Sequence, residues 1–357
     1  MKNSEKLRIP QSALSFLRSV AGAAGGLAIG LMICTIAGES PGKVLTVLVN
    51  SSFGSGYDFG MTLFYTSYFI LTGLAVAIPF KSGLFNIGGE GQLTIGALAA
   101  AWAGVAGAGI ESHALAILFA TLAAFIAGGI WGAIPGYLKA RRGSHEVITT
   151  IMMNFIAAGV TSYFTLYALK DPDSSQAETI PLSTVFQLKP FAVFNGAPMG
   201  GLIIALAVMT CVLHLVLRNS VWGYRLKATG ENETAASTFG IAAPASWLSS
   251  MFVAGGIAGL TGLVEVLGNS HRFKIGFSSD YGFVGIAVAL VARGNILGIL
   301  PSAFLFGVLQ KGAGSLDLET DKVTRDLTYI IQGLIILGVA SDGIWDWFSS
   351  IWRKRNA

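Results

Sequence analysis

A polar, glycine-rich stretch, Ser82 to Gln92 (SGLFNIGGEGQ), joins two long apolar runs. Asn86, Glu90 and Gln92 place amide and carboxyl groups close to the depth of a lipid bilayer. An ionisable residue there is costly unless protein buries it or a water-filled pathway wets it. The glycines around Glu90 predict broken or tightly turned backbone, which membranes accept only inside protein or beside a cavity. The alternative is a short cytoplasmic turn with a solvated Glu90.

A second polar stretch, His145 to Asn154 (HEVITTIMMN), opens another apolar run. At about 100° per residue, Glu146, Thr149, Thr150, Met153 and Ala157 fall on one helical face. That face can line a pathway or bond to another helix. Alternatively, the threonines bond back to their own helix and His145 and Glu146 lie at the water interface. No second His or Cys lies at ligand spacing from His145, so no metal site is predicted.

A third stretch, Gly223 to Ile241 (GYRLKATGENETAASTFGI), is a polar island between apolar segments. Its second half, Asn232 to Phe239, predicts a short helix that Thr229 or Asn232 caps and Gly240 ends. A short helix with an alanine face is suited to a groove on another protein. An ordinary cytoplasmic loop is the alternative, because loops between spans are often polar.

A polar hairpin, Asn269 to Gly282, is interpreted as a solvated turn, with an extracellular gate or docking patch as the alternative. The chain carries no nucleophile–base–orienter set, no paired carboxylates in a plausible cleft and no redox motif, so no catalytic residue is predicted. It also lacks the GxxxxGK[ST] motif that holds ATP phosphates. Composition and pattern therefore favour a transporter or channel.

Composition places the chain in a membrane. Hydrophobic residues make up 53% of its 357 residues and charged residues 12%, whereas soluble domains carry about 25% charged residues. A spanning helix needs about 20 apolar residues. The sequence predicts an all-α polytopic protein with about ten transmembrane helices, some broken or re-entrant: 16–37, 59–80, 91–110, 114–138, 146–168, 199–217, 247–267, 282–294, 296–313 and 328–348.

Cation placement predicts the orientation. With the N-terminus inside, 15 of the 23 Lys and Arg residues fall on the cytoplasmic side, as the positive-inside rule requires. Both termini are then cytoplasmic. We expect one transmembrane domain over residues 1–357, with a cytoplasmic loop at about 218–246 and an extracellular loop at about 170–198. A short surface helix is expected around Val44 to Val49.

Four segments resemble signatures of one family. LFNIGGEGQLTIGA (84–97), HEVITTIMMNFIA (145–157), the polar island and YGFVGIAVALVARGNILGI (281–299) are similar to stretches of bacterial ABC importer permeases for simple sugars and nucleosides. The second segment is typical of the longer permease of nucleoside-type systems. The matches follow the family order from about residue 60 to 340.

The resemblance implies a division of labour. This chain would be one permease of the bacterial inner membrane, beside a second, non-identical permease, a cytoplasmic ATP-binding subunit and an extracytoplasmic substrate-binding lipoprotein. It would bind no cofactor, because ATP would be bound by the partner. The polar island resembles the loop that couples to the ATPase, which implies roles for Gly230, Glu231, Asn232, Ala235, Ala236, Gly240 and Ile241.

The pathway candidates are the polar residues of the first two stretches: Asn86, Glu90, Gln92, Glu146, Thr150 and Asn154. The expected solute is a nucleoside or a related small sugar. The alternative function is an ion-coupled secondary transporter of a small polar solute. Such a carrier needs a network of ionisable residues within the membrane, and only Glu90, Glu146 and Glu265 are candidates for one.

Overall fold

The structure, a computed structural model, describes residues 11–320 and 322–340, and its regular elements there are helices. The predicted all-α class is confirmed. The α-helices are α1 (Gln11–Ile36), α2 (Pro41–Phe53), α3 (Gly56–Phe80), α4 (Gly89–Ala106), α5 (His113–Arg142), α6 (Glu146–Tyr163), α7 (Leu202–Asn219), α8 (Val221–Glu231), α9 (Glu233–Thr238), α10 (Ala243–Gly259), α11 (Tyr281–Val291), α12 (Ile299–Glu319) and α13 (Asp326–Ala340). Short turns of other helix types are η1 (Phe164–Ala168), η2 (Thr184–Phe186), η3 (Ala192–Phe194) and η4 (Leu263–Leu267).

Among the described residues, five helices are long and apolar enough to cross a membrane: Gly56–Phe80, His113–Arg142, Glu146–Ala168, Leu202–Asn219 and Ala243–Leu267. They confirm the spans predicted at 59–80, 114–138, 146–168, 199–217 and 247–267. Each of the other predicted spans also contains a helix, although α4 and α11 end before the predicted limits and α12 begins after its predicted start; the last span runs beyond residue 340 and so partly outside the described residues. The count of ten and the orientation of the termini stay predictions.

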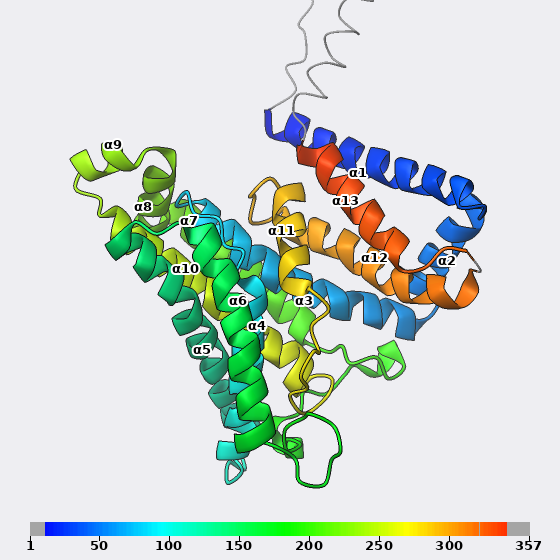
Figure 1. Cartoon of the computed structure of the whole chain (residues 1–357), viewed down its shortest axis with the longest axis horizontal. Coiled ribbons are helices and arrows are strands. Elements are labelled where there is room, and N and C mark those ends of the chain that lie inside the picture. The colour runs from blue at the N-terminus through cyan, green and yellow to red at the C-terminus, as the bar shows by residue number, and fades with distance from the viewer. Residues whose placement is uncertain (1–10, 321, 341–357) are drawn as a thin grey trace, which may run out of the picture. The chain divides into compact units, whose positions relative to one another are not determined.

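The chain packs as two units. Among the described residues, one unit contains 11–49, 312–320 and 322–340, and the other contains 50–311. In the first unit α1 lies along α13 (Figure 1). The contact is close because both helices carry glycine: a Cβ built on Gly26 would lie 2.5 Å from the backbone nitrogen of Ile335. Small residues of this kind allow helix backbones to approach each other in membranes.

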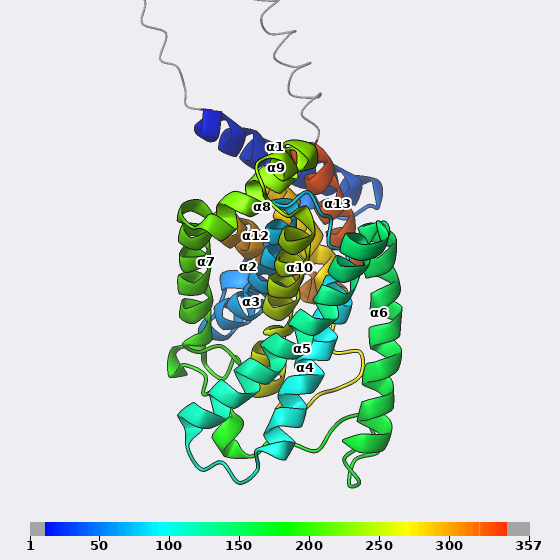
Figure 2. The same cartoon turned by 90° about the vertical axis from the view of Figure 1, so that its left-hand side faces the viewer.

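The second unit is built around α10, which packs against α3, α4, α5 and α8. Protein covers 89% of the apolar window of the span that begins with α10, but only 17% of that of α7. The helices α6 and α7 lie on opposite sides of this unit (Figure 2), and their exposed side chains are largely apolar. Such faces suit lipid or another membrane subunit. The inner helices α3, α4, α10 and α11 therefore position the polar groups described next.

Candidate functional site

The chain breaks its helical course between α3 and α4. After α3 ends at Phe80, residues 84–87 are non-helical, and α4 begins at Gly89. The fully buried Asn86 donates from Nδ2 to the carbonyl of Ala75 at 3.0 Å. Since Ala75 lies inside α3, the segment turns back alongside that helix. The broken backbone that the glycines predict is confirmed.

The buried side-chain amides of Asn86 and Gln92 stabilise the non-helical segment between α3 and α4. The Nδ2 of Asn86 donates to Oε1 of Gln92 at 2.9 Å, and Nε2 of Gln92 donates back to Oδ1 of Asn86 at 3.1 Å. The same Oδ1 accepts from the backbone nitrogen of Gly88 at 3.0 Å. A buried polar group without a partner costs about 1–3 kcal/mol. The amides thus supply the hydrogen bonds that the interrupted helix no longer provides.

Helix α6 closes the break from the other side. The side chain of Asn154 accepts from the backbone of Gly91 at 2.8 Å and donates to the carbonyl of Ile87 at 3.0 Å. The Thr150 hydroxyl donates to the carbonyl of Glu146 in its own helix at 2.8 Å and also lies 3.4 Å from the nitrogen of Ile87. Thr150 therefore bonds back to its own helix, as the alternative interpretation has it, and also contacts the non-helical segment before α4.

Glu146 lies apart from this network, at the first turn of α6. Its carboxylate is 3.1 Å from the ammonium of Lys139 near the end of α5. The ion pair ties the two helices together across the short turn that joins them. The structure thus brings together Asn86, Gln92, Thr150 and Asn154, with Glu146 one helical turn from Thr150.

Glu90 joins α4 to α11. Its Oε2 accepts from the backbone nitrogen of Gly282 at 2.8 Å. Asp280, at the N-cap position of α11, makes no side-chain capping bond, so Glu90 supplies the acceptor that a helix N-terminus needs. A Cβ on Gly282 would lie 2.2 Å from the nitrogen of Glu90. The first turns of the two helices are therefore in backbone contact.

The sequence did not predict a buried aromatic cluster that lies next to this contact. Tyr68 in α3 donates its hydroxyl to Glu265 at 2.5 Å, and Asn269 donates to the same carboxylate at 3.2 Å. The rings of Tyr68 and Tyr281 are 4.7 Å apart. The sequence marked Glu265 as a possible ionisable group, but no local signal pairs it with a tyrosine in another helix.

The polar island folds as α8 and α9. The side chain of Asn232 accepts from the nitrogen of Ala235 at 2.9 Å, and Gly240 ends the helix with a φ of +78°. The predicted short helix, its cap and its stop are confirmed. Ala236 and Ile241 are buried against the protein, whereas Phe239 is 82% exposed. The other residues implied in coupling, Gly230, Glu231, Asn232, Ala235 and Gly240, are exposed.

Helix α8 rests on the turn that precedes the helix break. A Cβ on Gly230 would lie 2.4 Å from the carbonyl oxygen of Lys81 and 2.9 Å from the nitrogen of Gly83. The indole of Trp247 in α10 donates to the carbonyl of Ser82 at 3.2 Å. Because Asn86 follows three residues after Gly83, α8 contacts the turn that leads into the segment before α4.

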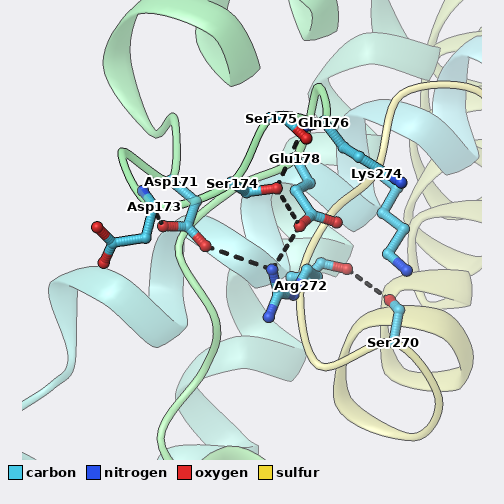
Figure 3. A pocket seen from close by; sticks show the side chains of 9 residues that line it. All are labelled: Asp171, Asp173, Ser174, Ser175, Gln176, Glu178, Ser270, Arg272 and Lys274. Atoms are coloured by element: carbon cyan, nitrogen blue, oxygen red, sulfur yellow. Dashed lines mark hydrogen bonds and ion pairs between the residues drawn. The ribbon is translucent and has the colours of Figure 1, made fainter.

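The hairpin at 269–282 pairs with the long loop after α6. Arg272 lies between two carboxylates, 2.6 Å from Glu178 and 3.3 Å from Asp171 (Figure 3). These residues line a polar pocket of about 660 Å³. Phe273 is buried, and its carbonyl accepts from the nitrogen of Thr179 at 2.9 Å. The solvated turn expected here holds only in part: Lys274 to Gly276 are exposed, whereas Phe273 is buried and bonds to the segment that contains Glu178 and Thr179.

Charge and hydrogen bonding stabilise the ionised form of Glu178. The hydroxyl of Ser174, and then the charge of Arg272, hold the pKa of Glu178 below its ordinary value of 4.5 against the opposing effect of burial. The Ser174 hydroxyl donates to Glu178 Oε1 at 2.7 Å. The loop and the hairpin are thus joined by an ion pair that is formed at neutral pH.

Residues 59–340 match a family model described as branched-chain amino acid transport system / permease component. The chain belongs to this permease family. It is 38% identical to the guanosine ABC transporter permease protein NupP of Bacillus subtilis, over 88% of this chain and 90% of that protein. It is 32% identical to the glucose ABC transporter permease protein TsgB13 of Haloferax volcanii, over 75% and 72% of the two chains.

The permease is also 26% identical to the guanosine ABC transporter permease protein NupQ of Bacillus subtilis, over 70% of this chain and 79% of that protein. No solved structure matches it. The permease is a multi-pass membrane protein of an ABC transporter, in which a separate subunit hydrolyses ATP.

Proposed function

We propose that this permease forms half of the pathway of an ATP-driven importer that carries a nucleoside or a related small sugar. The name of NupP supports the nucleoside class and that of TsgB13 keeps a simple sugar open. In this proposal about ten helices cross the bacterial inner membrane and both termini are cytoplasmic. A substrate-binding lipoprotein delivers the solute on the outer side, where the 170–198 loop lies.

The partners follow from the division of labour in such importers. Two guanosine permeases of one organism, NupP and NupQ, are both similar to this chain, which supports a second, non-identical permease as the other half. ATP is bound by a cytoplasmic subunit and not by this chain. The exposed helix α9, with Asn232, Ala235 and Gly240, docks in a groove of that subunit.

One observation carries the coupling mechanism: α8 touches the turn at Lys81–Gly83 through Gly230, without room for a side chain between them. ATP binding moves α9 and α8 as a rigid body. The displaced turn shifts the break before α4, and Glu90 passes the shift to α11 through Gly282. The helices on the two sides of the pathway then change their separation together.

The pathway candidates divide by their surroundings. Asn86, Gln92 and Thr150 are buried, and we assign them to the frame of the pathway. Glu90 and Asn154 are partly exposed, and we assign them to its wall. A nucleoside is a neutral amphiphile, so its path needs aromatic faces and a few amide or hydroxyl groups. Glu146 ties α5 to α6 behind this wall.

The test is a gentle-detergent purification of the tagged permease with identification of the proteins that accompany it. We expect a second permease and an ATPase, and we expect Gly240→Trp to lose the ATPase. No atom lies within 4 Å of a Cβ on Gly240, so the indole fills only outside space. The left-handed φ adds local strain of about 1–2 kcal/mol.

Gly276→Trp is the matched control, because Gly276 has the same φ of +78° and the same open space on the 269–282 hairpin. It should keep the ATPase. Loss of the ATPase in both variants would attribute the effect to strain and contradict docking through α9. Recovery of the permease alone from wild-type membranes would favour the ion-coupled carrier.

A further inference from the structure

A basic pocket of about 410 Å³ lies where α7 ends against α8. Four elements contribute to it: the turn after α3, the last turns of α7, the middle of α8 and the turn between α11 and α12. Its cations are Lys81, Arg218, Lys227 and Arg293, and Leu217 and Ile296 are among its apolar residues. No acidic side chain is among the residues that line it.

Three of these cations, Lys81, Arg218 and Lys227, are poorly compensated by the part of the chain that the structure describes. Within residues 11–320 and 322–340, no carboxylate lies within 4.0 Å of Lys81 or Arg218. Lys227 has Glu231 at 3.7 Å, but both side chains are at least 70% exposed, and such pairs are weak. Burial, followed by the charge of Lys227, holds the pKa of Lys81 below its ordinary value. An anion in the pocket would remove this repulsion.

The pocket lies at the end of α7, a span that the rest of this chain leaves largely uncovered. Only 17% of the apolar window of α7 is covered by protein, and Val208, Val212 and Leu215 on it are exposed. Arg218, in the last turn of the same helix, lines the pocket. An acyl chain that lies along α7 therefore leads to the cations at its end. A ligand with a charged head and an apolar tail fits both features.

We propose that this pocket binds the phosphate headgroup of an anionic lipid, such as phosphatidylglycerol, at the membrane surface where α7 ends. Basic pockets at the ends of membrane helices suit such headgroups. The bound phosphate would join the turn after α3 to α8, because Lys81 and Lys227 both reach it. It would thereby hold α8 in the contact that Gly230 makes.

The test is native mass spectrometry of the full-length permease in detergent, titrated with phosphatidylglycerol or phosphatidylcholine. We expect the wild type to retain phosphatidylglycerol preferentially. A basic residue near a membrane surface strengthens anionic-lipid binding about fivefold. The double variant Lys81→Gln/Arg218→Gln should therefore bind phosphatidylglycerol about 25-fold more weakly. Arg225→Gln is the control, since this exposed α8 cation does not line the pocket.

Four results would overturn the proposal. The first is equal retention of the two lipids, and the second is a double variant that binds phosphatidylglycerol like the wild type. The third is an Arg225→Gln variant that weakens phosphatidylglycerol binding as much as the double variant does. The fourth is displacement of the lipid by millimolar inorganic phosphate, which marks a site for a free anion. Melting temperatures of all variants in detergent verify folding. Lipid binding is measured without ATPase or uptake, so its failure is separate from that of the transport proposal.

Discussion

Replacing Gly230 by alanine tests the contact on which the coupling mechanism depends. The added Cβ would lie 2.4 Å from the carbonyl oxygen of Lys81, whereas ordinary contacts begin at 3.4 Å. The turn and α8 must therefore separate by about 1 Å. Overpacking of this kind costs about 1–3 kcal/mol, which exceeds the gain of at most about 1 kcal/mol that alanine brings to a helix interior. We expect a lower melting temperature and weaker coupling.

The assay compares solute uptake with ATP hydrolysis in proteoliposomes that contain the assembled transporter. Gly230→Ala should lower uptake per ATP hydrolysed severalfold, because α8 no longer holds the turn in its original position. Gly159→Ala is the matched control: Gly159 lies in α6, and no atom comes within 4 Å of its built Cβ. If Gly230→Ala is as stable and as tightly coupled as this control, the contact does not transmit movement.

Two further predictions concern carboxylates. Glu90→Ala leaves the Gly282 nitrogen without the acceptor now at 2.8 Å, so uptake should fall and the free energy of unfolding should drop by about 1–3 kcal/mol. Glu90→Gln keeps an acceptor oxygen and should lose less; equal melting temperatures and uptake for both variants and the wild type would leave Glu90 a solvated side chain. The lowered pKa of Glu178 adds stability that is complete above pH 4.5 and is lost as the pH falls through the lower folded value. Between pH 7 and 3, the melting temperature of Glu178→Gln should fall less steeply with decreasing pH than that of the wild type. An equally steep fall in both proteins would contradict the ion pair with Arg272.

Features that depend on neighbours along the chain were predictable. The five clear spans follow from the length of their apolar runs, because a helix satisfies its own backbone in lipid. The α9 helix follows from the side chain of Asn232, which caps its start, and from the left-handed backbone of Gly240, which ends it. Both effects act within a few residues. The broken backbone before α4 follows from its glycines for the same reason.

Which residues far apart in the sequence contact each other was not predictable. The contact of Gly230 with Lys81 and that of Tyr68 with Glu265 join elements far apart in sequence. The hairpin at 269–282 has the composition of a solvated turn, yet the loop after α6 folds over it. The burial of Phe273 in this hairpin depends on another segment, which composition alone does not report.

The sequence by itself determined that this chain spans a membrane, where most of its helices begin and end, and which stretches carry polar groups at depth. Those properties rest on hydrophobic length and local backbone preference. Only the tertiary structure decided that Glu90 caps α11, that Asn86 and Gln92 satisfy each other, and that α8 touches the helix break. A buried polar group must find a partner, but which partner it finds depends on how distant helices pack.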